Sequence, residues 1–537
     1  MTSARQVLPA VRPIVWTIAG SDSGGGAGIQ ADLATMSDLD THACSVISAV
    51  TAQSSVTVSL VEAVSAQMLS SQLNTLVTDL PPDAIKIGLL ADQRQIALLA
   101  LWLRDQQDIW LKAGVKVPVI LDPVMVATCG DALANGGALD FTPFKGLLTL
   151  ITPNVSELEV LAGHCLDDVG ACITAAKKLA DVLATSVLAK GGDRGPSWCQ
   201  HQANDLLVCR DVNGISAKHQ WQSFWLSSIR EASGNNHGTG CTLSSAIAAV
   251  MAHGFVLNDA VVVAKAYVSA GLRGSYQPGK GAGCLARTAW PRELSLFPYI
   301  KQVTQQDPLP AALINNALSR TGKLKGFKKI DEALGLYPVV ADVALLEMLL
   351  KAGAKTLQLR IKDTKEQALK EQSLEQQIIQ AIALGRDYQA RVFINDHWQL
   401  AIKHQAYGVH LGQEDLIESN LKQLDDADIA LGLSSHSYFE ILLAKQHNPS
   451  YIAFGHIFPT TTKVMPSKPQ GLAKLARYVS LMKGELPIVA IGGIDASRLA
   501  SVKATGVDDI AVVRAVTESD DPAAAFKALA QAWLEES

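Results

Sequence analysis

Short β-rich runs alternate with stretches of helical periodicity along this chain, in two separate series. The first series begins at residues 14–19 and ends near residue 274, and the second runs from Tyr337 to the C-terminus. Alternation of this kind favours a largely parallel sheet covered by helices. Because 537 residues exceed what one hydrophobic core accommodates, we expect two α/β domains.

The first series predicts a doubly wound sheet. Its β-rich runs lie at residues 14–19, 44–49, 84–87, 119–121, 148–151 and 187–189. Ligands of such sheets bind beyond the carboxyl ends of the strands. Polar residues follow the runs at those ends, namely Asp22, Gln53, Asp122, Asn154 and Lys190. The glycine-rich loop at 20–28 lacks the Lys of a P-loop and the spacing of a dinucleotide site, so phosphates are expected to bind elsewhere.

The turn at 237–241 is the predicted anion site of this domain. Gly238 and Gly240 precede an apolar helical run at 243–251, and they let the backbone approach a ligand closely. Amide groups at a helix start, together with the helix dipole, favour an anion. Cys241 would lie in that field, which predicts a lowered thiol pKa. The alternative is an ordinary helix start with two turn glycines and a buried cysteine.

Asn154 and Glu157 lie three residues apart at a predicted strand end. They could share a magnesium ion through water, since this metal prefers few protein carboxylates plus phosphates. The alternative is a helix N-cap region, with Glu157 in the first turn of a helix at 156–162.

Seven motifs of the first domain occur together and in order. They are Ala-Gly-Ser-Asp (19–22), Gly-Gly-Ala-Gly-Ile-Gln-Ala-Asp (25–32), Thr-Ala-Gln (51–53), Asp-Pro-Val-Met (122–125), Thr-Pro-Asn-x-x-Glu (152–157), Lys-Gly-Gly (190–192) and Asn-His-Gly-Thr-Gly-Cys-Thr-Leu-Ser (236–244). This set resembles the hydroxymethylpyrimidine/phosphomethylpyrimidine kinases of thiamine synthesis, which have a ribokinase-like fold.

The resemblance implies a role for each motif. Asp32 and Gln53 would hold the aminopyrimidine, and Cys241 would be the catalytic residue that takes the proton from the hydroxymethyl group and then from its monophosphate. The remaining residues would serve ATP and magnesium or line the anion hole: Asp122, Asn154, Glu157, Lys190, Gly238, Thr239 and Gly240.

The boundary between the domains is predicted near residues 301–330. A glycine-rich segment at 277–283 and a proline-containing polar segment at 294–310 follow the last helical pattern of the first domain. We therefore expect a first domain at 1–300, a linker at 301–330 and a second domain at 331–537.

The second series predicts a (β/α)8 TIM barrel. Candidate strands begin near Tyr337, Thr356, Arg391, Gly408, Ile429, Tyr451, Pro487 and Ile510. Eight near-even units fit such a barrel, whose chemistry gathers at the carboxyl ends of the strands, and an open doubly wound sheet is the alternative. At those ends Arg360 and Lys362 could clamp phosphate oxygens, and Asp396 and Asp415 could hold magnesium with a pyrophosphate. Ordinary polar or core roles are expected for His397, His410, His436 and His456.

The second domain resembles thiamine phosphate synthase. The motifs are Gln-Leu-Arg-x-Lys (358–362), Ile-Asn-Asp (394–396), Leu-Gly-Gln-x-Asp-Leu (411–416), Gly-x-Ile-Phe-x-Thr-x-Thr-Lys (455–463) and Ile-Gly-Gly-Ile (491–494). The resemblance implies that Asp396 and Asp415 bind Mg²⁺ and that Ser434 contacts the pyrimidine. The pyrimidine diphosphate would be bound by Gln358, Arg360, Lys362, Asn395 and Lys463. The thiazole phosphate would be held by Thr460, Thr461, Thr462, Gly492, Val513 and Arg514, the last standing where a serine is usual.

Composition narrows the classes of partner. The net charge of −5 comes without a basic stripe, which argues against nucleic acid. No apolar run is long enough to cross a bilayer, and the eight cysteines form no C-x-x-C pair, so a reducing, cytoplasmic setting is expected. A homo-oligomer is left open.

The combined prediction is a bifunctional enzyme that uses ATP and Mg²⁺ on small molecules. The alternatives are a pyridoxal-type kinase joined to another phosphate-binding barrel and a non-catalytic thiamine or pyrimidine sensor. A sensor has no need of a pyrophosphate clamp, which favours an enzyme.

Overall fold

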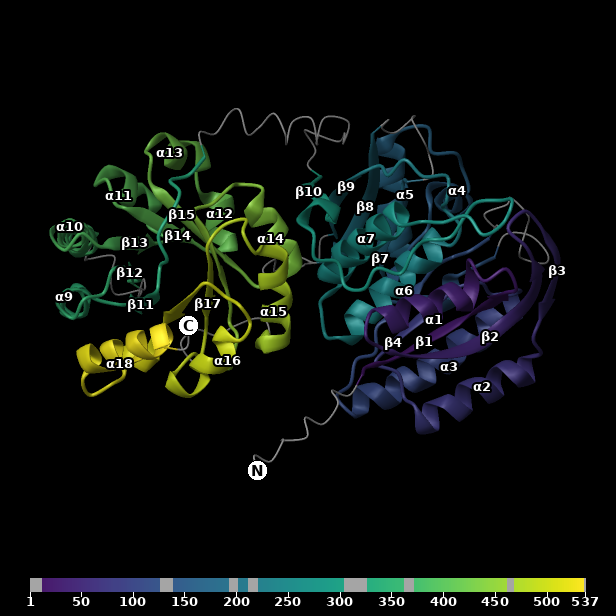
Figure 1. Cartoon of the computed structure of the whole chain (residues 1–537). Helices are drawn as coiled ribbons and strands as arrows, with labels where there is room; N and C mark the ends of the chain where they lie inside the picture. Colours follow the sequence, from purple (N-terminus) through teal and green to yellow (C-terminus); the bar gives the residue numbers. More distant parts are fainter. Residues whose placement is uncertain are drawn as a thin grey trace, which may run out of the picture. The chain divides into compact units, whose positions relative to one another are not determined.

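The computed structural model describes residues 12–125, 139–192, 201–210, 221–303, 326–361, 371–460 and 468–535 (Figure 1). The chain divides into two compact units, residues 1–313 and 314–537. Much of the predicted linker lies outside the described residues, so the domain limits given above stay predictions. Among the described helices, none combines the length and the apolar character needed to span a membrane.

The first unit is built on a ten-stranded sheet with the order β10-β9-β8-β7-β6-β5-β4-β1-β2-β3. The strands β1, β2 and β4 to β7 are mutually parallel, whereas β3, β8, β9 and β10 run antiparallel to their neighbours. The predicted doubly wound sheet is confirmed. The strands are β1 (Ile14–Asp22), β2 (His42–Gln53), β3 (Val58–Ala63), β4 (Ala84–Ile87), β5 (Val119–Leu121), β6 (Leu150–Ile151), β7 (Ser186–Lys190), β8 (Gln202–Arg210), β9 (Trp221–Ile229) and β10 (Tyr299–Gln302).

Helices cover both faces of this sheet. Successive side chains of β1 point to opposite faces, and those on both faces are buried. Trp16 and Ile18 enter a core cluster together with side chains of the helices from α2 to α5. Thr17 between them points the other way and hydrogen bonds to α1, which packs against α6, and α6 against α7. The helices are α1 (Gly28–Asp38), α2 (Ala66–Asp79), α3 (Gln93–Lys112), α4 (Val155–Ala162), α5 (Val169–Leu183), α6 (Thr239–Ala252) and α7 (Leu257–Arg273), with short 3-10 turns η1 (Thr142–Phe144) and η3 (Leu294–Leu296).

The second unit is a closed barrel of eight parallel strands. Pairing of β11 with β18 closes it, so the TIM barrel is confirmed and the open sheet is excluded. Each strand begins within one residue of its predicted start. The strands are β11 (Leu336–Val340), β12 (Thr356–Leu359), β13 (Arg391–Asn395), β14 (Gly408–Leu411), β15 (Ala430–Ser435), β16 (Tyr451–Phe454), β17 (Ile488–Ile491) and β18 (Asp509–Val512).

Aromatic rings fill the barrel interior. Tyr337, Phe393 and Tyr451 are at most 1% exposed and lie in one cluster with small aliphatic residues. Gly432 makes this possible, because a Cβ there would lie 2.2 Å from the ring of Tyr451. The surrounding helices are α9 (Val343–Lys351), α10 (Glu371–Asp387), α11 (Trp398–Lys403), α12 (Gln413–Glu418), α13 (Leu421–Asp426), α14 (Tyr438–Lys445), α15 (Gly471–Met482), α16 (Leu499–Lys503), α17 (Arg514–Thr517) and α18 (Pro522–Glu535), with the 3-10 turn η5 (Ala496–Arg498).

Candidate active sites

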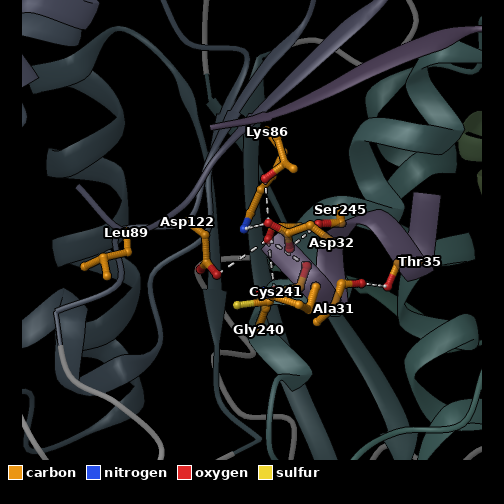
Figure 2. A network of polar contacts seen from close by, with 12 residues as sticks. Ala31, Asp32, Thr35, Lys86, Leu89, Asp122, Gly240, Cys241 and Ser245 are labelled. Atoms are coloured by element: carbon orange, nitrogen blue, oxygen red, sulfur yellow. Dashed lines mark hydrogen bonds and ion pairs between the residues drawn. The ribbon is translucent and has the colours of Figure 1, made fainter. Parts of the chain in front are cut away.

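In the first unit a buried ion pair lies below the turn that begins α6. Asp32 of α1 and Lys86 of β4 are 2.7 Å apart, and neither side chain is exposed. The carboxylate of Asp32 also accepts hydrogen bonds from Thr17 and Ser245, each at 2.6 Å. Figure 2 shows the amino group of Lys86 pointing at this carboxylate, with Asp122 and Cys241 on the same side of the site. Three strong donors therefore already occupy Asp32, which sequence reasoning assigned to the substrate.

The pKa of Lys86 reflects these neighbours. Burial alone would lower it, but the carboxylate of Asp32, followed by Cys241 and Asp122, raises the pKa above the ordinary value. Lys86 is therefore a permanent positive charge beneath the site. No separate sequence signal pointed to it beyond its position at the end of a strand.

A second ion pair lies at the edge of the sheet. Lys190 at the end of β7 is 2.8 Å from Asp122, and 3.9 Å from Glu157. Asp122 also accepts from Thr152 at 3.0 Å. Although burial opposes it, Lys190 and Lys86 hold the pKa of Asp122 below its usual range. The structure thus brings together Asp122, Glu157 and Lys190, as the sequence predicted.

The turn before α6 has the predicted glycine conformation. Gly238 is the N-cap residue with φ +76°, and a Cβ there would lie 2.0 Å from the carbonyl oxygen of Gly26. A Cβ on Gly240 would lie 3.2 Å from the Nζ atom of Lys190. The first-turn amides of a helix, here including those of Thr239 and Gly240, have no acceptor within the helix backbone. The amide of Thr239 donates to the carbonyl oxygen of Asn236 at 3.3 Å. A helix start with a lysine beside it suits an anion.

The predicted lowering of the Cys241 pKa is wrong. Burial raises the pKa of this thiol to about 11; Lys86 opposes the shift, whereas Asp32 and Asp122 add to it. The helix start is present as expected, but removal of the thiol from water and two nearby carboxylates outweigh its field. Cys241 is therefore a neutral thiol near pH 7.

The glycine-rich loop after β1 is wrapped around a carboxylate rather than open to phosphate. The backbone amides of Gly24, Gly26 and Ala27 donate to Asp22 at 2.8, 3.1 and 2.8 Å. The same carboxylate lies 3.2 Å from Nε2 of His237, directly before Gly238. Burial opposes ionisation, but His237 and the loop amides hold the pKa of Asp22 below its usual range. Asp22 and His237 thereby connect the loop to the anion turn, a link that the sequence analysis missed although both residues stood in its motifs.

Asn154 and Glu157 have the N-cap geometry that was the alternative to metal binding. The side chain of Asn154 accepts from the amide of Glu157 at 2.8 Å, and Glu157 accepts from the amide of Asn154 at 2.7 Å. Gln53, at the end of β2, is partly exposed, and its carboxamide oxygen accepts from Thr51 at 3.3 Å. Their assignment to magnesium and to the pyrimidine stays a prediction.

In the barrel two carboxylates meet at the ends of β13 and β14. Asp396 directly follows β13 with φ +64°, and Asp415 lies in the first turn of α12. Burial and the neighbouring Asp415 raise the pKa of Asp396 to about 6, while Arg360 and Asn395 oppose the shift. A pair of carboxylates that repel each other fits a divalent cation. Among the described residues no third His, Cys, Asp or Glu joins them.

Two positive-φ glycines follow β17. Gly492 and Gly493 have φ +104° and +67°, and the amide of Phe458 donates to the carbonyl oxygen of Gly492 at 3.0 Å. A Cβ on Gly493 would lie 2.8 Å from the carbonyl oxygen of Pro459, so the segment before Thr460 packs against this turn. Val513 and Arg514 begin α17 after the neighbouring β18. Four predicted site residues lie outside the described residues: Lys362, Thr461, Thr462 and Lys463.

The barrel histidines lie apart from any three-ligand cluster in the described residues. His410 of β14 is buried between Tyr451, at 2.7 Å, and Ser434, at 2.8 Å. Burial, with Arg360 adding to the effect, lowers the pKa of His410 to about 4. His436 hydrogen bonds Glu440 at 2.9 Å.

Each unit therefore carries cationic groups and glycine turns at the carboxyl ends of parallel strands, the arrangement of a phosphate-handling transferase. Residues 22–286 match the family model described as phosphomethylpyrimidine kinase, and residues 336–516 match that of thiamine monophosphate synthase. The chain belongs to both families: its first unit is a phosphomethylpyrimidine kinase domain and its second a thiamine-phosphate synthase domain.

Individual relatives match one unit each. The thiamine-phosphate synthase of Salmonella newport (strain SL254) is 55% identical over 195 residues, 36% of this chain and 90% of that protein. The phosphomethylpyrimidine kinase structure from Clostridium difficile 630 shares 31% identity, covering 48% of this chain and 98% of that one with a TM-score of 0.37. A pyridoxal kinase structure from Staphylococcus aureus shares 26%, covering 55% of this chain and 100% of that one with a TM-score of 0.44.

Replacing Gly238 by alanine is expected to lower kinase turnover by about 100-fold, because displacement of the turn by an ångström suffices for such a loss. The new methyl group would collide with Gly26. Gly254 is the matched control: it has φ +79°, yet nothing lies within 4 Å of its Cβ position. Gly254→Ala should lower stability without lowering kinase turnover, and equal losses in both variants would show that backbone strain alone is responsible. The synthase activity of the same chain reports intact protein.

Proposed function

We propose that the first unit transfers the terminal phosphoryl group of ATP to 4-amino-5-hydroxymethyl-2-methylpyrimidine and then to its monophosphate, and that the second unit joins the diphosphate to 4-methyl-5-(2-phosphoethyl)thiazole. The match of each unit to a family acting on the same intermediate carries this proposal. The charges gathered in each unit agree with it.

In the kinase unit, the proposed anion hole is the turn from Gly238 to Gly240 with the nearby charge of Lys190. Phosphoryl transfer requires mainly positioning and charge stabilisation, which amides and a lysine supply. Lys190 is held in place by Asp122 at 2.8 Å. In each transfer the substrate O–H bond breaks and an O–P bond forms to the terminal phosphorus of ATP. The bond between that phosphorus and the bridging oxygen breaks, and ADP leaves with the electron pair. The small fraction of Cys241 present as thiolate is proposed to accept the proton.

Asp32 is proposed to act through Lys86 rather than by touching the pyrimidine, because its carboxylate has no exposed surface. Gln53 at the partly exposed end of β2 keeps its proposed contact with the aminopyrimidine, whose donor and acceptor match a carboxamide. Asn154 and Glu157 are proposed to bind ATP–Mg²⁺. Their capping hydrogen bonds use Oδ1 of Asn154 and Oε2 of Glu157. The metal would therefore be bound through the second carboxylate oxygen of Glu157 or through water.

In the synthase unit, the diphosphate is proposed to bind Arg360 and Asn395 in the described residues, with Lys362 and Lys463 as further predicted contacts. Asp396 and Asp415 would hold Mg²⁺, which would neutralise charge on the leaving pyrophosphate. The carbon–oxygen bond to the diphosphate breaks, and pyrophosphate takes the electron pair. The thiazole nitrogen then donates its lone pair to the pyrimidine methyl cation. Thr460, Gly492 and the backbone of Val513 and Arg514 are proposed to hold the thiazole phosphate.

One coupled assay tests the whole proposal. The full chain is given the hydroxymethylpyrimidine, the thiazole phosphate and ATP with Mg²⁺, and thiamine phosphate, ADP and pyrophosphate are measured. We expect two ADP and one pyrophosphate for each thiamine phosphate. Phosphorylation of pyridoxal in preference to the hydroxymethylpyrimidine would favour a pyridoxal-type kinase, and binding without turnover would favour a sensor.

A further inference from the structure

A continuous chain of hydrogen bonds crosses the interior of the barrel. Nε2 of Gln358 donates to Oη of Tyr337 at 3.1 Å, and the two phenol oxygens of Tyr337 and Tyr451 are 2.8 Å apart. Tyr451 lies 2.7 Å from Nδ1 of His410, whose Nε2 lies 2.8 Å from Oγ of Ser434. Only Ser434 is appreciably exposed, so the chain connects the buried core to the barrel mouth.

The two tyrosines lie where phenylalanine would fill the same space. Tyr337 and Tyr451 are 1% and 0% exposed and pack against Phe393 and small aliphatic side chains. A buried hydroxyl group is costly unless it is hydrogen bonded. Both hydroxyls are hydrogen bonded: they bond to each other, and Tyr337 also bonds to Gln358 and Tyr451 to His410.

The donors and acceptors fix the direction of the chain. The amide nitrogen of Gln358 can only donate, so Tyr337 accepts there and passes its own proton to Tyr451. Tyr451 in turn donates to Nδ1 of His410. A neutral imidazole has one N–H group, which must then be on Nε2 and donate to Ser434. If the hydrogen bonds ran the other way, Tyr451 would donate to Tyr337. The hydroxyl proton of Tyr337 would then face the amide nitrogen of Gln358, which cannot accept it, and would have no acceptor among the described residues.

We propose that Tyr337, Tyr451 and His410 are positioning residues that set Ser434 as a hydrogen-bond donor and leave the carbonyl oxygen of Gln358 as an acceptor toward the pyrimidine. This inference rests on the proposed function of the barrel, with Ser434 contacting the pyrimidine and Gln358 binding the pyrimidine diphosphate, as the resemblance to the synthases implies. An aminopyrimidine presents an amino donor and unprotonated ring nitrogens that accept, which complements these two groups. A 4-oxo-pyrimidine presents an acceptor and an N–H donor in place of the amino group and its neighbouring ring nitrogen. The chain therefore selects the amino form.

The direction of the chain is tested without any ligand. Nitrogen-15 NMR of the full chain distinguishes the two neutral histidine tautomers, and a His410→Asn variant identifies the signal of His410. We expect the Nε2–H tautomer in the wild type. The Nδ1–H tautomer would overturn the proposed direction of the hydrogen bonds, whether or not the protein turns over its substrates.

The specificity is tested by competitive inhibition of the synthase in the absence of ATP, so that the kinase unit is inactive. The probes are hydroxymethylpyrimidine monophosphate and its 4-oxo counterpart. We expect the amino compound to bind on the order of 100-fold more tightly, because a reversed donor and acceptor leave buried polar groups unpaired. Tyr337→Phe removes the group that directs the chain and should reduce this ratio about tenfold or more.

Tyr407→Phe is the matched control, since Tyr407 packs against the same aromatic cluster outside the chain of hydrogen bonds described here. This variant should keep the wild-type ratio. An unchanged ratio in Tyr337→Phe would overturn the inference, as would equal binding of the two probes by the wild type. Failure of both probes to bind would instead contradict the proposed function, while the tautomer of His410 still decides the direction of the chain.

Discussion

Replacing Asp396 by asparagine is expected to lower thiamine phosphate formation by about 10²–10³-fold, the usual loss when a group that stabilises developing charge is removed. Burial and the neighbouring carboxylate of Asp415 raise the pKa of Asp396, and a bound divalent cation would offset the repulsion between the two carboxylates. The measurement is synthase turnover as a function of Mg²⁺ concentration. The variant should need far more Mg²⁺, whereas kinase turnover by the same chain should not change.

The backbone makes asparagine the right replacement. Asp396 has φ +64°, a conformation that asparagine adopts nearly as well as aspartate. Because the substitution removes a repulsive charge, the thermal midpoint of the variant without Mg²⁺ should equal or exceed that of the wild type. Asp428, with φ +55° before the start of β15, is the matched control, and Asp428→Asn should leave turnover unchanged. A lowered thermal midpoint with an unaltered Mg²⁺ requirement would contradict a role in binding the cation.

The sequence predicted the fold where local pattern determines it. Apolar runs bounded by glycine and polar residues located every strand of the barrel, because each of its strands is buried on both faces. The same signal missed the antiparallel strands β3, β8, β9 and β10. In β9, Ser223, Ser227 and Ser228 break the apolar pattern, yet their side chains are buried.

The candidate sites were predictable only as far as strand ends could be located. Because parallel strands end at one edge, Asp122, Lys190 and Glu157 were expected together and are together. Burial and charge balance are properties of the packed state, so the complete enclosure of Asp32 with Lys86 could not be read from spacing. The same limit explains the error for Cys241: helix position is encoded locally, whereas the carboxylates of Asp32 and Asp122 come from distant parts of the chain.

The raised pKa of Cys241 gives the proposed base a testable pH dependence. Below its pKa of about 11 the thiol is protonated, so the thiolate fraction, and with it the kinase rate, should rise about tenfold per pH unit from about pH 7 to about pH 9.5. Cys241→Ala should lower turnover by about 100-fold near neutral pH, the usual contribution of a general base, and should abolish this slope. Both are measured as ADP release under saturating substrates.

Two further variants test whether the pH dependence belongs to Cys241. Cys241→Ser should behave as Cys241→Ala, since a serine hydroxyl ionises at far higher pH than a thiol and cannot restore the slope. Cys165, an exposed cysteine of the same unit, provides the control, and Cys165→Ala should keep both the rate and the slope. Wild-type turnover that does not vary with pH would mean that the thiolate takes no proton from the substrate. A slope that persists in Cys241→Ala would assign the proton to another group, and unchanged turnover in that variant would remove Cys241 from catalysis altogether.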